Sequence, residues 1–258
     1  MSTISLSPSD FTQDEMYFVL RDAIIPRPIA WVSSVDLNGN TNLAPYSFFN
    51  VCSPSPPILG FSCGPRGEDR KSEQFALKDT WANIQATKEF VVNIVPENLA
   101  EAMVRSSDPL PHGESEFAHA GLTPVPSMIV KPPRVQGVPI AYECVLREGI
   151  PLGRNTWVMG EVVKVHIDER AYVGEKRGFK HRVDVLTHVE LRPYARLGSN
   201  FYARLREIET LERRDGGQYR RAFGHRMKAR RSLIVAADRR LQLVERRELD
   251  LRDARFLL

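Results

Sequence analysis

The sequence is poor in cysteine and has no long apolar run. Its three cysteines, Cys52, Cys63 and Cys144, are spaced too widely for a C-x-x-C metal motif or a disulfide framework. No stretch approaches the roughly 20 apolar residues of a membrane-spanning helix. The first residues lack the charged start and apolar run of a secretory signal. We therefore expect a cytoplasmic protein that does not enter a membrane, with Cys52 and Cys63 as small buried side chains.

Several catalytic signatures are also absent. No G-x-G-x-x-G links a strand to a helix, which disfavours a Rossmann dinucleotide site, and no G-x-S-x-G marks a nucleophilic serine. No cysteine lies in an obviously electropositive setting, so a reactive thiolate is not expected either. Nucleophilic catalysis therefore has little support in this sequence.

Charge is distributed unevenly along the chain. The whole sequence has a formal net charge of +4 and a pI of about 9.0, which would by themselves suggest a nucleic-acid partner. Residues 213–258, however, contain 13 arginines and one lysine against six acidic residues, a net charge of +8 that leaves −4 for residues 1–212. The larger part lacks basic patches interleaved with aromatic residues, so a nucleic-acid partner is not expected.

These patterns divide the chain into three parts. They are an N-terminal arm (residues 1–20), a main domain (residues 21–212) and an arginine-rich tail (residues 213–258). The tail is expected to be a solvated, partly ordered extension. An arm that binds nucleic acid or an acidic partner and a helix that contacts a second subunit are the alternatives.

Short apolar segments bounded by turn residues dominate the main domain. They are rich in β-branched and aromatic residues, which favours strands. Gly160, inside the longest segment, is expected to mark a bulge or a close approach. Many short strands with few helices predict an antiparallel barrel rather than a doubly wound α/β fold. The predicted strands are residues 29–35, 57–63, 90–95, 142–146, 157–167 and 187–191.

Helical patterns are short. Ser9 and Asp10 are expected to cap a helix in the N-terminal arm. Residues 96–107 have an apolar face and a proline in the first turn, as at the start of many helices. A further helix is expected to begin at Asp79. The predicted fold class is therefore mainly β with short helices.

Residues 26–50 carry the most informative pattern. A predicted strand is followed by Asn38-Gly39, which easily takes positive φ and suits a hairpin turn. The next segment is expected to be a crowded turn in which amides, a hydroxyl and flat rings lie together. Such groups would suit a planar cofactor with polar edges, such as a flavin, although a hairpin that runs into a core loop explains them equally well. The residues concerned are Asn42, Ala44, Pro45, Tyr46, Ser47, Phe48 and Phe49.

A second pattern, Lys78-Asp79-Thr80, lies where a helix is expected to begin. Helix N-termini bind anions through their amides and dipole, and a lysine and a hydroxyl would strengthen such a site. These residues could hold the phosphate of a flavin mononucleotide. The alternative is a surface charge run followed by an ordinary helix cap.

Residues 112–119 contain two histidines and two glutamates. Their order lacks the H-x-x-x-H spacing of a helical metal pair, so no metal site is expected. A solvated loop is the simplest interpretation of the segment. If the segment has a functional role, His112 would line an entrance for the substrate.

The order and spacing of these patterns resemble the flavin reductase-like family, whose fold is the FMN-binding split barrel. The similarity covers about residues 15–205 and is greatest to the branch with flavoredoxin-type proteins and the reductase components of two-component monooxygenases. The matching segments are residues 26–34, 42–49, 78–80, 83–84, 90–93, 115–117, 120–123, 143–144, 160–162 and 196–198, with Tyr202.

The resemblance implies a homodimer that binds FMN non-covalently near the subunit interface, with residues 42–49 along the ring and ribityl chain. Amides near Ser47 and Phe48 would bond the polar edge of the ring, and Lys78 and Thr80 would hold the phosphate. The implied reaction takes hydride from NADH or NADPH and passes electrons to free flavin, a monooxygenase component or another acceptor. No catalytic acid or base is expected, because hydride transfer belongs to the flavin.

The sequence departs from the family at one place. Some flavin reductases carry a histidine just before the strand that here begins near Trp157, whereas this chain has Arg154-Asn155-Thr156. A role for that histidine in positioning nicotinamide cannot be transferred. Two alternatives therefore stay open: an electron-transfer flavoprotein without direct NAD(P)H activity, and a non-catalytic interaction module with a basic tail.

Overall fold

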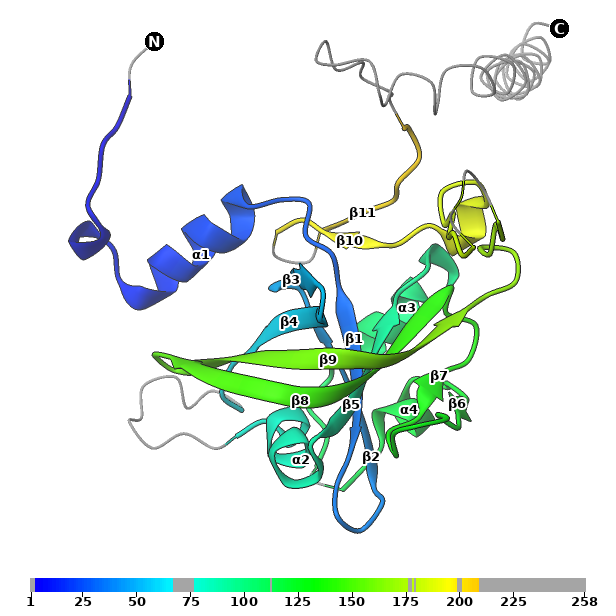
Figure 1. The fold of residues 1–258 in the computed structure, drawn as a ribbon. Coiled ribbons are helices and arrows are strands. Elements are labelled where there is room, and N and C mark those ends of the chain that lie inside the picture. Colours follow the sequence, from blue (N-terminus) through cyan, green and yellow to red (C-terminus); the bar gives the residue numbers. More distant parts are fainter. Residues whose placement is uncertain are drawn as a thin grey trace, which may run out of the picture. The chain divides into compact units, whose positions relative to one another are not determined.

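The computed structural model describes residues 3–66, 77–111, 113–175, 178, 180–198 and 201–208 (Figure 1). The chain divides into a compact unit, Met1–Ile208, and a second unit, Glu209–Leu258. The predicted arginine-rich tail and His112 lie outside the described residues. Among the residues that are described, no helix is both long and apolar enough to cross a membrane.

A seven-stranded antiparallel sheet forms the centre of the compact unit (Figure 1). Its strands are β1 (Ala30–Val35), β2 (Thr41–Tyr46), β3 (Phe49–Pro54), β4 (Pro57–Cys63), β5 (Glu89–Ile94), β8 (Ile140–Leu152) and β9 (Asn155–Ile167). They follow the order β2-β1-β5-β8-β9-β4-β3. The sheet curls, so the rings of Tyr46 in β2 and Phe61 in β4 lie 4.8 Å apart. The predicted fold class, mainly β with short helices, is confirmed.

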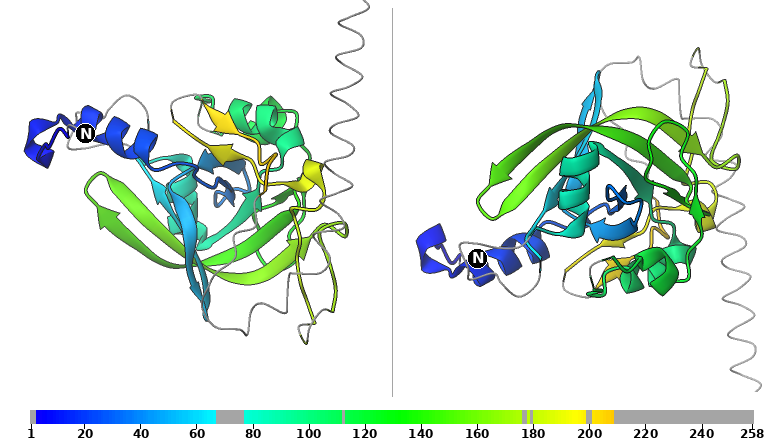
Figure 2. Two further views of the ribbon diagram at one scale, coloured as in Figure 1. Left: turned by 90° about the horizontal axis from the view of Figure 1, so that it is seen from above. Right: turned by 90° about the horizontal axis from the view of Figure 1, so that it is seen from below.

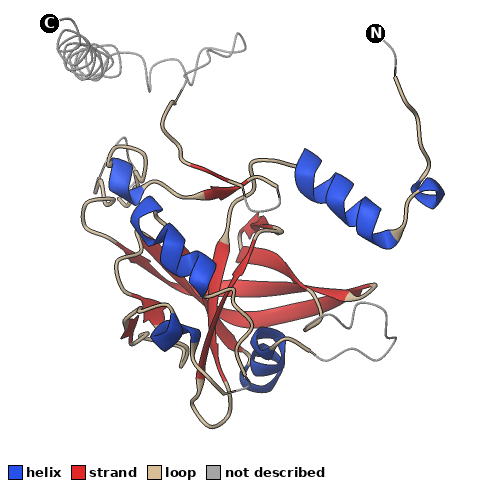
Figure 3. Ribbon diagram, turned by 180° about the vertical axis from the view of Figure 1, so that it is seen from behind, coloured by secondary structure: helices blue, strands red, loops and turns tan. Residues whose placement is uncertain are grey.

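Two small ladders and several short helices complete the unit. The ladders pair β6 (Pro124–Val125) with β7 (Arg134–Val135) and β10 (Ala195–Arg196) with β11 (Tyr202–Ala203). The helices are α1 (Gln13–Ala23), α2 (Asp79–Thr87), α3 (Ala100–Arg105) and α4 (Glu116–His119), with single 3-10 turns at Pro8–Asp10, Glu97–Leu99 and Val189–Leu191. Figure 3 shows that α2, α3 and α4 lie against the sheet, whereas α1 extends away from it.

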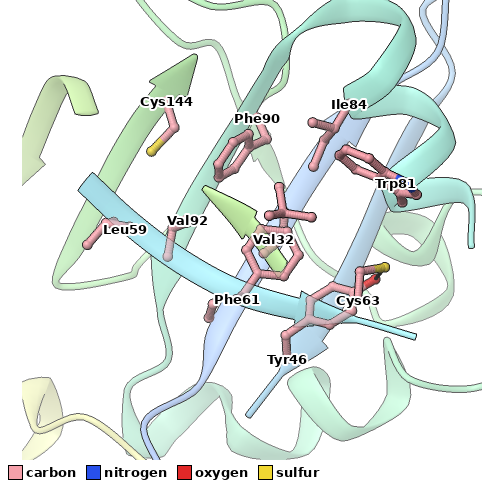
Figure 4. Close-up of a cluster of buried hydrophobic side chains, with 12 residues drawn as sticks. Val32, Tyr46, Leu59, Phe61, Cys63, Trp81, Ile84, Phe90, Val92 and Cys144 are labelled. Atoms are coloured by element: carbon pink, nitrogen blue, oxygen red, sulfur yellow. Dashed lines mark hydrogen bonds between the residues drawn. The ribbon is translucent and has the colours of Figure 1, made fainter. Parts of the chain in front are cut away.

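The core has two main clusters, one on each face of β1. Successive side chains of a strand point to opposite faces, and every residue of β1 is buried. Val32 belongs to the first cluster, which Trp81 and Ile84 of α2 complete (Figure 4). Trp31 belongs to the second cluster, which includes Met103 of α3. Figure 2 shows that the long β8–β9 hairpin, which forms the middle of the sheet, is strongly curved.

Most predicted strands are present. Residues 142–146 and 157–167 belong to the longer strands β8 and β9, whose hairpin turns at Gly153 with a φ of 61°. The expected strand at residues 187–191 is wrong, because this segment contains the 3-10 turn Val189–Leu191. The turn is closed by a hydrogen bond from the Leu191 amide to the His188 carbonyl (3.1 Å), and it buries Leu191.

The segment expected as a crowded turn is also different. It consists of β2, a two-residue corner at Ser47 and Phe48, and β3. A strand is possible despite Pro45 because β2 ends the strand order and pairs only with β1 in the sheet. At such an edge, a missing amide donor does not interrupt a ladder on both sides.

Gly160 marks a close approach, as the sequence predicts. A Cβ atom built at Gly160 would lie 2.2 Å from Cζ of Phe90, whose side chain is fully buried. Because Phe90 occupies the volume that any larger residue would need, only glycine fits at this point of β9. The ring in turn packs edge-on against Phe61, with centroids 5.7 Å apart.

The three cysteines are free thiols. Cys63 and Cys144 are buried, as expected for Cys63. The expectation for Cys52 is wrong, because this residue is exposed on β3. The reason lies in the sheet order: β3 is the last strand, and its side chains are only partly covered.

The N-terminal helix α1 has no buried residue. Its N-cap is Thr12, whose hydroxyl accepts a hydrogen bond from the Glu15 amide in a capping box, and not the predicted Ser9 and Asp10. Its apolar side chains remain exposed, for example Phe18 (45%) and Leu20 (46%). Short helices draw most of their stability from packing, so α1 is expected to need a covering surface.

A buried carboxylate holds a proline-rich loop against β8. Glu143 is fully buried and accepts hydrogen bonds from the amides of Met128 (2.7 Å), Ile129 (2.6 Å) and Val130 (3.0 Å). Nε2 of His166 lies 2.5 Å from Oε1 of Glu143, the oxygen that also accepts the Met128 amide. Burial would raise the pKa of Glu143, but these hydrogen bonds lower it to about 2.

Candidate functional site

Side chains of β2 alternate between the two faces of the sheet, and this divides the predicted cofactor residues into two groups. Ala44 and Tyr46 pack with the first cluster, beside α2. Leu43 belongs to the second cluster. Pro45 points the same way as Leu43 and lines a small pocket together with Ser47. The even-numbered residues therefore face α2, and the odd-numbered ones face the opposite side.

A buried polar network joins β2 to the start of α2. Nδ2 of Asn42 donates to the Thr80 hydroxyl (2.8 Å) and to the Ser34 hydroxyl (3.3 Å). Nδ2 of Asn83 also donates to Ser34 (3.2 Å). All four side chains are buried, and Thr80 is only 1% exposed. The network satisfies these polar groups and fixes the first turn of α2 against the strand.

Lys78 immediately precedes α2 and brings a positive charge to the helix start. Its Nζ lies 5.6 Å from the centroid of the Tyr46 ring, a distance suited to a cation–π contact. Asp79, the first residue of the helix, is paired with Arg66 (Nη1–Oδ1 2.8 Å). Arg66 also donates to the Leu110 carbonyl (3.0 Å). The carboxylate at the helix start is thus offset by Arg66, and Lys78 adds a further cation beside it.

Tyr46 and Cys63 lie together at one end of the first cluster (Figure 4), with the thiol 3.5 Å from the phenol oxygen. Burial raises the pKa of Tyr46 well above its usual value. Burial also raises the pKa of the Cys63 thiol. Both groups are therefore neutral near pH 7, and neither has the character of a nucleophile or a base.

The corner between β2 and β3 offers backbone donors. The β1–β2 ladder ends at the pair Ala30–Tyr46, and the β3–β4 ladder begins at Phe49–Phe61. The amides of Ser47 and Phe48 therefore lie outside both ladders. Backbone amides in such a corner can bind an acceptor on a ligand, because strand pairing does not use them.

Arg27 supports this corner and was missed by sequence reasoning. It is 5% exposed, and its Nε lies 3.4 Å from the Ser47 hydroxyl. Its guanidinium carbon lies 5.6 Å from the centroid of the Phe48 ring. The centroids of the Phe48 and Tyr17 rings are 6.3 Å apart. Burial and the nearby charge of Arg196 lower the pKa of Arg27. An arginine between two prolines was the only local signal, and it does not reveal burial.

The histidine-rich segment is only partly described. His112 lies outside the described residues, so its predicted role stays a prediction. His119 lies at the end of α4, with Nε2 2.8 Å from a carboxylate oxygen of Asp108. Glu116 accepts a hydrogen bond from the Leu43 amide (2.9 Å) and so docks α4 on β2; burial raises its pKa. No group of three metal-binding side chains occurs among the described residues.

The structure thus arranges the predicted residues along one edge strand and its corner. Asn42, Tyr46, Lys78 and Thr80 meet on the α2 side, with Asp79 held by its ion pair. Ala44 and Phe49 pack against the first core cluster, and the other side and the corner hold the remaining residues. They are Pro45, Ser47 and Phe48.

Known proteins resemble this chain along most of its length. The family profile described as "Flavin reductase like domain" matches residues 21–181. The chain belongs to the flavin reductase-like family. Nitrilotriacetate monooxygenase component B from Bacillus cereus is 34% identical, with a TM-score of 0.72 over 82% of this chain and 100% of that one. The 2-nitrobenzoate 2-nitroreductase NbaA of Pseudomonas fluorescens is 30% identical, with a TM-score of 0.68 over 81% of this chain and 95% of that one.

A third solved structure defines the fold by name. A protein from Shewanella frigidimarina with a split barrel domain is 23% identical, with a TM-score of 0.66 over 82% of this chain and all of that one. The curled seven-stranded sheet of this flavin reductase-like protein is accordingly a split barrel, as the resemblance in the sequence implied.

Proposed function

We propose that this flavin reductase-like protein is an FMN-dependent oxidoreductase that takes hydride from NADH or NADPH. The electrons would pass to free flavin or to another acceptor. Family membership supports flavin chemistry. The observation that carries the choice of site is the corner at Ser47 and Phe48, where two backbone amides lie outside both ladders, next to the Arg27 guanidinium.

The donor set of this edge fits a flavin mononucleotide. Amides at Ser47 and Phe48 would bond the polar edge of the ring and favour the negative charge of its reduced form. Lys78 and the first amides of α2 would hold the phosphate, while Thr80 keeps that turn in place through Asn42. When bound, FMN supplies the group that accepts and donates hydride. The full proposed set is Asn42, Ala44, Pro45, Tyr46, Ser47, Phe48, Phe49, Lys78, Asp79 and Thr80.

We also propose that the protein is a homodimer. Helix α1 leaves Tyr17, Phe18, Val19 and Leu20 each between 38% and 46% exposed. Covering these side chains would stabilise the helix, and a second copy of the chain is the partner we favour. Sedimentation velocity over a range of concentrations tests this proposal, and a monomer at micromolar concentration would contradict it.

The proposed electron acceptor follows from the similarity to a known protein. The similarity to a component of nitrilotriacetate monooxygenase supports a monooxygenase component as the acceptor, with free reduced flavin as the carrier. We place the protein in the cytoplasm, because its three free thiols suit a reducing compartment.

An electron-transfer flavoprotein without direct NAD(P)H activity is the second candidate. It is favoured by Arg154-Asn155-Thr156, which stand where some flavin reductases have a histidine. Stopped-flow mixing of the oxidised holoprotein with NADH or NADPH separates the two candidates. A pure carrier would not be reduced by either nucleotide and would need a partner protein.

The proposal is tested first by the colour of the purified protein. We expect a yellow protein, or one that becomes yellow with added FMN, whose visible bands bleach anaerobically with NADH or NADPH. Adding the two nucleotides separately shows which one is preferred. A colourless protein that does not bind added FMN would contradict the proposal.

A further inference from the structure

A small pocket lies on the side of β2 that faces away from α2. Ile29, Pro45 and Met103 provide apolar walls, and Ser47 and Arg196 provide the polar groups. Lys78 lies on the opposite side, over the ring of Tyr46. A cation therefore lies on each side of β2: Lys78 on one and Arg196 on the other.

A second guanidinium, that of Arg27, lies next to this pocket, with its Nε 3.4 Å from the Ser47 hydroxyl. Arg27 and Arg196 exchange two backbone hydrogen bonds of 2.9 Å, so their positions are fixed relative to each other. The guanidinium of Arg27 donates to the carbonyls of Arg21, Ile24 and Leu197, which are neutral acceptors. The two positive charges repel each other, and this repulsion contributes to the lowered pKa of Arg27. A bound anion would relieve the repulsion.

Both polar groups of the pocket are held in place before any ligand arrives. The Ser47 oxygen accepts from Nε of Arg27 (3.4 Å), which leaves the hydroxyl hydrogen to be donated elsewhere. Arg196 donates to the Tyr202 hydroxyl (2.6 Å) and lies 4.9 Å from the centre of that ring. Tyr202 is in turn stacked on Tyr194, with centroids 5.5 Å apart. Little side-chain entropy would be lost when an anion binds to groups held in this way.

We propose that Arg196 and Ser47 bind a phosphate group of the nicotinamide dinucleotide, with the neighbouring Arg27 adding positive charge. This inference rests on the proposed reductase function and deepens it. The ring edge of the flavin is assigned to the corner at Ser47, and its phosphate to Lys78 on the other face. The pocket at Arg196 therefore lies beside the ring, where a co-substrate must approach, and away from the phosphate of FMN itself.

Steady-state kinetics of the FMN-loaded protein test the assignment. In Arg196→Gln, KM for the preferred nucleotide should rise about ten- to a hundredfold, as expected for loss of a charge-assisted contact, while kcat stays within about twofold. Arg196→Lys keeps the charge without the forked geometry and should show a smaller rise. KM of the unsubstituted protein should also rise with ionic strength, because salt screens the attraction.

The matched control is Arg147→Gln. Arg147 lies on β8, and its side chain is 58% exposed and paired with Glu161 (3.4 Å). This substitution should leave KM unchanged. Circular dichroism melting shows which variants are folded. If Arg196→Gln is not folded, the test uses Arg196→Lys instead.

Titration with ADP-ribose, which has the pyrophosphate but no reactive nicotinamide, gives a readout that does not depend on activity. Calorimetry should show binding that is weakened at least tenfold in Arg196→Gln. The inference is overturned if ADP-ribose binds both proteins equally, or if the variant loses FMN affinity while KM for the nucleotide is unchanged. If the unsubstituted protein is not reduced by either nucleotide, the reductase proposal fails, and the ADP-ribose titration still decides the phosphate subsite.

Discussion

The side-chain amide of Asn42 donates to the Thr80 hydroxyl over 2.8 Å, and this bond ties the edge strand β2 to the first turn of α2. Asn42→Ala removes it together with the weaker bond to Ser34. The hydroxyls left behind are buried, so the free energy of unfolding should fall by about 1–3 kcal/mol. Urea unfolding monitored by circular dichroism measures the change.

The control for this prediction is Asn38→Ala in the exposed β1–β2 turn. Its effect should remain within about 0.5 kcal/mol, as for most surface substitutions. Equal stability of the Asn42 variant and the unsubstituted protein would show that the network contributes nothing to the fold.

Lys78→Gln should distinguish a contact with the flavin phosphate from a contact with the flavin ring. If Lys78 holds the phosphate, the variant should bind FMN at least tenfold more weakly and bind riboflavin, which lacks the phosphate, as well as before. Quenching of flavin fluorescence measures both affinities. Lys131→Gln, on an exposed loop residue, is the control. A similar loss for both ligands would place Lys78 next to the ring instead.

Glu143 makes the stability of the protein depend on acidic pH. Its pKa is lowered from 4.5 to about 2 in the folded state. The stabilisation is therefore complete above the unfolded-state pKa and is lost as pH falls through the window between about 4.5 and 2. A pKa shift of this size corresponds to about 3 kcal/mol of the free energy of unfolding.

Comparison of Glu143→Gln with the unsubstituted protein isolates this effect. Urea unfolding at pH 6, 4 and 3 gives the free energy of unfolding of both proteins. The difference between them should be large at pH 6 and should become smaller as the pH falls. Glu148→Gln, on an exposed residue of β8, should leave the pH dependence unchanged. A difference that is constant with pH would contradict the assignment of the lowered pKa to this carboxylate.

Gly160→Ala should be destabilising because the new methyl group would meet the ring of Phe90. Overpacking of this kind costs roughly 1–3 kcal/mol. In a Phe90→Leu background the space is partly vacated, so the same substitution should cost less. Thermal unfolding of the four proteins completes the double-mutant cycle, and strict additivity would argue against the contact.

The central strands could be predicted from sequence because each is a continuous apolar segment between turn residues. Strand β4 has the predicted limits, Pro57–Cys63. Strand β2 could not be predicted in this way, because Asn42 and Pro45 are typical of turns. The curl of the sheet and the edge position of β2 make this composition acceptable in a strand, and neither is visible in local sequence.

The candidate site could be predicted only in part, because its residues come together from separate segments of the chain. Asn42 and Thr80 were chosen separately, from a polar cluster and a helix start, and their contact emerges only in three dimensions. Arg27 and Arg196 were not chosen at all. Their pairing joins the beginning and the end of the barrel domain, and no periodicity in the sequence connects two such distant positions.

If β2 and its corner bind FMN as proposed, the alternation of side chains along β2 couples correct folding to cofactor binding. The β1–β2 register pairs Ser34 with Asn42 and Ala30 with Tyr46. A slip of one residue would exchange the two faces, burying polar groups in one core cluster and removing Tyr46 from the other. On this proposal, a molecule with a slipped hairpin would not bind FMN, and FMN retention would report which molecules have reached the native pairing.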